Sequence, residues 1–183
     1  MEIKMVVFDF DGVIVKSGNV ENIWRWCAAK MKIKTPKIFF FCQEIIEFIF
    51  NKKPKPIKET IEIMKKLSKN CCFVGILTDR SLWSLKFSLS FNLSFDDFDF
   101  IQTRKSILDC FIEKQHSINS CSKTKPDSQT LKNLKEFAAK KKLNIKEILI
   151  IDDLAQAVEL ACAEGFSGLH VKHINYIRYI KNI

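Results

Sequence analysis

The 183-residue sequence has no long uninterrupted apolar segment. The stretch from Ile38 to Phe50 is broken by Gln43, Glu44 and Glu47, and it is shorter than the roughly 20 residues that a bilayer span needs. The seven cysteines show no repeated metal-type spacing, and their odd number favours reduced thiols. We therefore expect a cytoplasmic protein that has no membrane span.

Arginine is also scarce, although the chain carries a formal net charge of +9. Such a charge raises the question of nucleic acid binding. However, arginine is the side chain that reads phosphates and bases with two parallel hydrogen bonds, and lysine dominates here. We interpret the charge mainly as solvated lysines, with nucleic acid as a partner that is not favoured. A basic surface would still attract anionic substrates.

Apolar runs of strand length alternate with helix-like segments, which is typical of a parallel α/β sheet. The composition is 47% hydrophobic, enough for the core of one domain. The chain begins directly with an expected strand, so we expect no signal peptide. The expected strands are Met5 to Phe8, Cys72 to Leu77, Phe98 to Gln102 and Ile148 to Ile151, and the expected helices between them include Ile57 to Ser68 and Leu82 to Phe91.

Two carboxylates follow the first expected strand, in the sequence Asp9-Phe10-Asp11-Gly12-Val13. Alternate residues of a strand face the same way, so Asp9 and Asp11 would project together if the extension persists to Asp11. Two carboxylates at close range repel unless a cation lies between them or one keeps its proton. A phosphoryl-transfer site uses both arrangements, with one carboxylate as nucleophile and Mg²⁺ ligand and the other as proton donor.

Three further fragments are Ile76-Leu77-Thr78-Asp79, Lys125-Pro126-Asp127 and Ile150-Ile151-Asp152-Asp153. Each of the four also has an ordinary interpretation. The first fragment resembles a turn with a helix cap, the second and fourth resemble helix caps, and the third resembles a helix start. Their order favours a ligand site instead, because three of them end apolar strands, and ligands bind at that edge of a parallel sheet.

With these four fragments in this order, the sequence resembles the haloacid dehalogenase-like (HAD) hydrolase superfamily over nearly its whole length. The resemblance implies that Asp9 is the nucleophile that becomes an aspartyl-phosphate and that Asp11 is the general acid and base. It also implies that the Thr78 hydroxyl holds the transferring phosphoryl group. Lys125 would neutralise charge on Asp9 and on the phosphate.

The resemblance further implies a Mg²⁺ cofactor. Asp152 would be the metal-binding acid, and Asp153 a second ligand or a partner that orients the ligand. The carboxylate of Asp9 and the backbone carbonyl of Asp11 would complete the set of Mg²⁺ ligands that the protein supplies.

The fold that the resemblance implies is a three-layer, Rossmann-like parallel sheet with a small helical cap. Residues 1–16 and 52–183 would form the core, and residues 17–51 the cap. The cap helix expected from Ile38 to Phe50 is too rich in apolar side chains for one face of an isolated helix pair. It would pack against the core or, as the second choice, form a homo-oligomer through the cap.

Residues 103–124 are longer than the corresponding connection in compact members of the superfamily. We leave open whether they form a second cap or a loop, and we interpret Ser117 to Ser122 as loop-like. After Asp153, Leu154 to Gly165 and Gly168 to Val171 resemble the family's next helix and last core strand.

Asp11 favours phosphoryl transfer over carbon–halogen cleavage, because the dehalogenases of this superfamily lack that acid. We therefore expect a Mg²⁺-dependent phosphomonoester hydrolase that acts on a small phosphorylated substrate through an aspartyl-phosphate intermediate. One alternative is a phosphatase for the 3′ or 5′ ends of polynucleotides, suggested by the charge and the small cap. Another is a non-catalytic binding protein with the same fold. The motifs contact only the phosphate and do not specify the physiological substrate.

Overall fold

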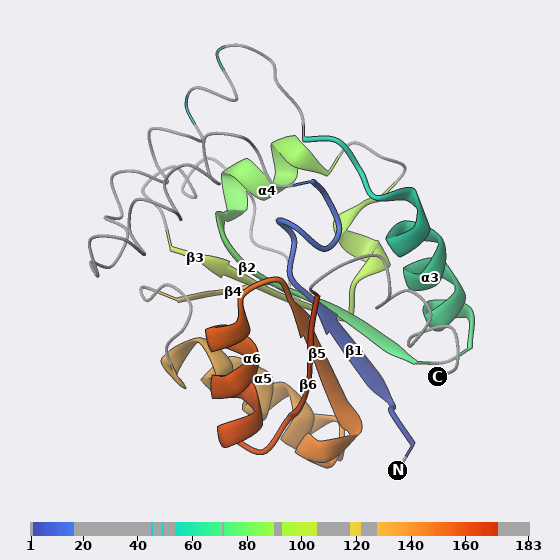
Figure 1. The fold of residues 1–183 in the computed structure, drawn as a ribbon, viewed down its shortest axis with the longest axis vertical. Helices are drawn as coiled ribbons and strands as arrows, with labels where there is room; N and C mark the ends of the chain where they lie inside the picture. The colour runs from blue at the N-terminus through green and yellow to red at the C-terminus, as the bar shows by residue number, and fades with distance from the viewer. Residues whose placement is uncertain are drawn as a thin grey trace.

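The computed structural model describes residues 2–16, 45, 49, 54–70, 72–89, 93–105, 118–121 and 128–171. Within these residues, six strands form one parallel sheet in the order β4-β3-β2-β1-β5-β6 (Figure 1). The strands are β1 Met5–Phe8, β2 Phe73–Ser81, β3 Phe100–Arg104, β4 Ile118–Cys121, β5 Ile148–Asp152 and β6 Ser167–His170. The expected parallel α/β sheet is confirmed.

Helices cover both faces of the sheet, which gives three layers (Figure 1). The helices are α3 Lys58–Lys69, α4 Leu82–Ser88, α5 Ser128–Lys140 and α6 Ala155–Ala163, with short 3₁₀ helices at Phe95–Asp97 and Ile145–Glu147. The central strand β1 shows the two faces most clearly. Val6 and Phe8 pack with α3 and α4, whereas Met5 and Val7 pack with α5 and α6. Because both faces are covered, every residue of β1 is apolar and buried.

The loop after β1 is fastened to the start of α3. The Thr60 hydroxyl donates to the carbonyl of Val13 at 2.8 Å, and the backbone N–H of Ile57 donates to the carbonyl of Ile14 at 2.8 Å. Val13 and Ile14 are themselves fully buried in the core. These contacts hold the segment that follows Asp11 against the start of α3.

The structure corrects several expected boundaries. The prediction of a loop over Ser117 to Ser122 is wrong, because Ile118–Cys121 forms β4 and pairs in parallel with β3. Strand β2 runs on past Leu77 to Ser81, with a register irregularity between these two residues. Strand β3 begins at Phe100 rather than Phe98, and α4 ends at Ser88 rather than Phe91.

Most of the predicted cap, residues 17–51, lies outside the described residues, apart from Ile45 and Ile49, which are both helical. Lys125 and the cap's role as a domain also fall outside them and stay predictions. None of the helices in the described ranges combines the length and the apolar character required to cross a membrane.

Candidate active site

Asp9 and Asp152 lie side by side at the edge of the sheet where the parallel strands end. The register pairs Phe8 of β1 with Ile151 of β5, and the backbone N–H of Asp9 continues the ladder by donating to the carbonyl of Ile151 at 2.8 Å. Asp9 and Asp152 are both buried, with 3% and 1% of their surface exposed. The sheet thus places two carboxylates at the edge where open parallel sheets bind ligands.

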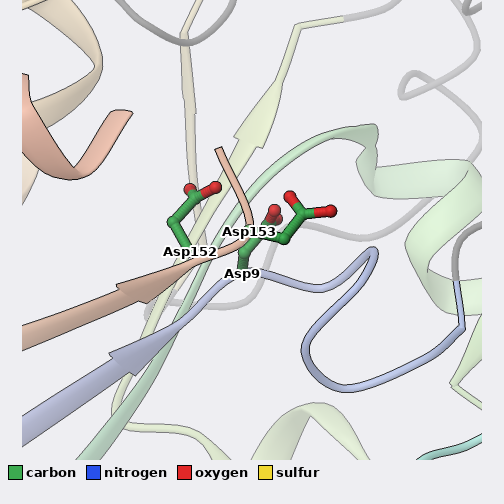
Figure 2. Close-up of side chains that lie close together, drawn as sticks. All are labelled: Asp9, Asp152 and Asp153. Carbon is green, nitrogen blue, oxygen red and sulfur yellow. The ribbon is translucent and has the colours of Figure 1, made fainter. Parts of the chain in front are cut away.

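Asp153 joins these two residues to form an acidic cluster of Asp9, Asp152 and Asp153 (Figure 2). One carboxylate oxygen from each of the three lies within 4.8 Å of the others. Backbone N–H groups orient two of them, because Phe10 donates to Asp9 Oδ1 at 2.7 Å and Leu154 donates to Asp152 Oδ1 at 2.8 Å.

The donor set of the acidic cluster fits a hard divalent cation. All three ligands on offer are carboxylate oxygens, which suit Mg²⁺ and not a thiolate-bound or imidazole-bound metal. Like charges at this distance repel one another, so a cation among them would stabilise the arrangement.

Gly12 makes room for the Asp153 side chain. Its φ of +84° lies in the left-handed region, which residues with a Cβ atom rarely adopt. A Cβ atom at this position would overlap Asp153 Oδ2 and lie 2.6 Å from Asp153 Cγ. The glycine therefore serves both the turn after β1 and the close approach of the third acid.

The last strand holds the backbone of the Asp152–Asp153 turn. Val171 donates its backbone N–H to the carbonyl of Asp152 at 2.9 Å, and a ring nitrogen of His170, Nε2, lies 3.0 Å from the carbonyl oxygen of Asp153. No role was predicted for His170 from the sequence, and its contact is with the backbone of the turn.

Asp11 does not extend the first strand. Strand β1 ends at Phe8, a turn begins at Phe10, and Asp11 forms an isolated bridge with Val15. The condition for Asp9 and Asp11 to project together as alternate strand residues is therefore not met. The turn instead directs the Asp11 carboxylate to a partner on β2.

That partner is Arg80, near the end of β2. Its Nε and Nη2 atoms donate to Asp11 Oδ2 and Oδ1, each at 2.8 Å. Both residues are buried, with 6% of Arg80 and 8% of Asp11 exposed. Two parallel hydrogen bonds between a guanidinium and a carboxylate fix both the position and the plane of the carboxylate.

Arg80 is held in turn by α4 and by the turn after β1. Its Nη1 donates to the hydroxyls of Ser84 at 3.0 Å and Ser88 at 3.2 Å, and its guanidinium carbon lies 5.4 Å from the centre of the Phe10 ring. This residue was not predicted from the sequence. The available signal was an arginine at the end of an apolar strand, followed by serines one helical turn apart.

No protein-family model and no curated protein sequence matches this chain. Solved structures do match it. A haloacid dehalogenase-like hydrolase from Bacteroides fragilis aligns over 97% of this chain and 93% of its own length, with a TM-score of 0.64 and 18% identity. A HAD-superfamily hydrolase from Ehrlichia chaffeensis covers 100% and 98%, with a TM-score of 0.60 and 13% identity.

The L-2-haloacid dehalogenase of Xanthobacter autotrophicus aligns over 92% of this chain and 77% of its own, with a TM-score of 0.59 and 16% identity. The chain has the haloacid dehalogenase-like fold. At these identities the similarity concerns the fold, and it confirms at that level the resemblance found in the sequence.

Within this HAD-like fold, Thr78 lies in β2 at the register irregularity and is 4% exposed. Its hydroxyl oxygen accepts a hydrogen bond from the backbone N–H of Arg80 at 3.1 Å. The interpretation of Thr78-Asp79 as a helix cap is wrong, because the N-cap of α4 is Ser81, which accepts from the N–H of Ser84. Thr78 is therefore hydrogen-bonded to Arg80, the residue that holds Asp11.

Asp152 and Asp153 are not the N-cap of the next helix either. The N-cap of α6 is Leu154, whose side chain makes no cap hydrogen bond. Helix α5 begins at Ser128, so the sequence Lys125-Pro126-Asp127 directly precedes a helix.

Proposed function

We propose that the protein is a Mg²⁺-dependent phosphomonoester hydrolase that acts through an aspartyl-phosphate formed on Asp9. The observation that carries the proposal is the acidic cluster, in which three carboxylates converge to within 4.8 Å at the ligand-binding edge of a HAD-like sheet. Keeping three such groups close together costs free energy, and this is expected where they bind a cation.

In the proposed reaction, Asp9 attacks phosphorus in line with the departing oxygen. Asp11 protonates the departing alkoxide and then removes a proton from the water that cleaves the aspartyl-phosphate. The Thr78 hydroxyl and the Lys125 ammonium hold the phosphoryl oxygens. Mg²⁺ bound by Asp9, Asp152, Asp153 and the carbonyl of Asp11 would offset the negative charge that develops on those oxygens.

The acidic cluster supports phosphoryl transfer over the carbon–halogen cleavage named for several similar structures. Displacement of a halide needs one carboxylate nucleophile and generates no phosphoryl group whose charge must be neutralised. Three converging carboxylates would also repel the carboxylate of a 2-haloacid. Asp11, the acid that the resemblance assigns to phosphatases, is present and held in place by Arg80.

The test is to measure phosphate release in the presence of Mg²⁺ from phosphorylated metabolites and from oligonucleotides phosphorylated at the 3′ or 5′ end. Halide release from 2-chloropropionate is measured in parallel. We expect phosphate release from small phosphomonoesters. Preference for the oligonucleotides would favour the polynucleotide phosphatase, whereas halide release without phosphate release would overturn the proposal.

We also propose that residues 17–51 form the cap and select the substrate. Contacts remote from phosphorus position the substrate, so changes there should alter the ranking of substrates more than the shared phosphoryl step. Trp24 and Arg25 belong to this segment, and an aromatic ring and a cation are suited to contact the leaving group. Trp24→Ala and Arg25→Ala, compared with the unmodified protein on the same substrates, test this. An equal change in rate for every substrate would contradict it.

A further inference from the structure

We propose that Arg80 is a positioning residue that holds Asp11 in its working orientation, and that Ser84 and Ser88 hold Arg80. The inference rests on the proposed function, because it assigns Arg80 a part in the same reaction. Asp11 is on a turn and not in a strand, so the sheet alone does not fix its carboxylate.

The contact between Arg80 and Asp11 is suited to orientation as well as to charge. Two nitrogens of one rigid guanidinium reach the two oxygens of one carboxylate at 2.8 Å each, which fixes the carboxylate plane. A lysine at this position would supply a similar charge through a single flexible ammonium. The geometry, and not the charge alone, therefore distinguishes arginine from lysine here.

Helix α4 supplies the fixed point of this arrangement. Ser84 and Ser88 are 2% and 0% exposed, and both accept hydrogen bonds from the third guanidinium nitrogen of Arg80. The Phe10 ring, beside Asp11 in the sequence, lies 5.4 Å from the guanidinium carbon. A continuous set of buried contacts thus connects α4 with the Asp11 carboxylate through Arg80.

The ion pair can stay closed while Asp11 reacts. The guanidinium occupies one acceptor site on each oxygen, and a carboxylate has about four such sites, so each oxygen keeps one for the leaving group or for water. Opening the pair would separate two buried groups of opposite charge, which costs free energy. We therefore infer that Asp11 works from the orientation seen in this structure.

The experiment is a double-mutant cycle in the 183-residue protein with Mg²⁺ and glycerol 2-phosphate, whose alkoxide leaving group needs a proton. We expect Arg80→Lys to lower kcat by about 10- to 100-fold, as misplacement of a reacting group does, with KM changed by less than about twofold. Asp11→Asn should lower kcat by about 100-fold or more. In the Asp11→Asn background, Arg80→Lys should have no further effect, because Arg80 acts through Asp11.

Arg104→Lys is the matched control. Arg104, the last residue of β3, is 5% exposed. Its Nε donates to the backbone carbonyl of Asp79 in β2 at 2.9 Å. Any effect of this substitution on kcat should be the same in the unmodified protein and in the Asp11→Asn background. If Arg80→Lys only disturbed this edge of the sheet in general, its effect on kcat would likewise be the same with and without Asp11→Asn.

If Arg80→Lys does not fold, the double variant Ser84→Ala and Ser88→Ala takes its place in the cycle, with a smaller loss of kcat that should also vanish beside Asp11→Asn. An unchanged kcat, or losses that multiply, overturns the role of Arg80. Unmodified protein that releases no phosphate from any phosphomonoester refutes the proposed function itself, and the role of Arg80 with it.

Discussion

Two neighbouring parts of the sheet edge, at the ends of β1 and β5 and at the end of β2, arrange charged side chains differently. The acidic cluster at the ends of β1 and β5 gathers three carboxylates, whereas the end of β2 pairs the carboxylate of Asp11 with the guanidinium of Arg80. The first region brings three groups of like charge together, and in the second two groups of opposite charge contact each other. We infer that the first region binds a ligand and the second orients a reacting group.

The largest effect is expected from Asp9→Asn, which removes the proposed nucleophile from the acidic cluster. Phosphate release should fall by about four orders of magnitude or more, in the range seen when a covalent catalyst loses its nucleophile. Thermal unfolding of the variant should remain cooperative, which separates loss of chemistry from loss of fold. Turnover close to that of the unmodified protein would exclude Asp9 as the nucleophile.

Removal of Mg²⁺ should affect the acidic cluster next. Exhaustive chelation is expected to abolish phosphate release, and added Mg²⁺ to restore it, because the cluster offers oxygen ligands only. Mg²⁺ at about 100 times its Kd should also raise the free energy of unfolding by about 2.7 kcal/mol. This second readout needs no substrate. Activity that survives chelation would show that the cluster is not a metal site.

The two regions differ in how far the sequence predicts them. Asp9 and Asp152 follow apolar runs that must be buried strands, and parallel strands end at one edge, so their proximity follows from local patterns. The Arg80–Asp11 pair joins residues 69 positions apart and depends on the turn at Phe10. No local periodicity encodes that contact.

Strand β4 escaped prediction for a related reason. Its sequence, Ile118 to Cys121, is short and half polar, and it joins the sheet by backbone pairing with β3. A short strand with two polar residues leaves little trace in the hydrophobic pattern. The longer course of β2 is similar, because Thr78 to Ser81 are polar yet complete the strand.

The ion pair of Asp11 and Arg80 should contribute several kcal/mol to the free energy of unfolding, as a buried ion pair does when one partner is removed. Asp11→Asn is expected to lower the free energy of unfolding by about 3–5 kcal/mol, because it removes the charged partner of the Nε and Nη2 atoms of the buried Arg80 guanidinium. Denaturant unfolding in the presence of a chelator measures this without any contribution from metal. A loss below about 1 kcal/mol, on the order of an exposed ion pair, would contradict the burial of the pair.

Gly12→Ala should cost less stability but disturb the acidic cluster. A left-handed backbone costs a residue with a Cβ atom about 1–2 kcal/mol, and the added methyl group would also displace the Asp153 side chain. We expect weaker Mg²⁺ binding, measured by calorimetry. Gly165→Ala is the matched control, since Gly165 also has a positive φ, of 94°, but a Cβ atom there would meet the side chain of Ile145 rather than an acid. Equal loss of Mg²⁺ affinity in both variants would contradict a specific role for Gly12.

The smallest expected effect is a change in the free energy of unfolding that should have opposite signs for a substitution in the acidic cluster and for one in the ion pair. Asp152→Asn removes one of three converging negative charges, and its side-chain oxygen can still accept the hydrogen bond from the N–H of Leu154. Without metal, relief of repulsion should raise the free energy of unfolding by about 1 kcal/mol. With excess Mg²⁺ the variant should be less stable than the unmodified protein, because it has lost a metal ligand and gains less stability from Mg²⁺ binding. Asp11→Asn should destabilise under both conditions. If Asp152→Asn lowers stability equally with and without Mg²⁺, the cluster contributes to the fold in the same way as the ion pair, and the contrast between the two regions fails.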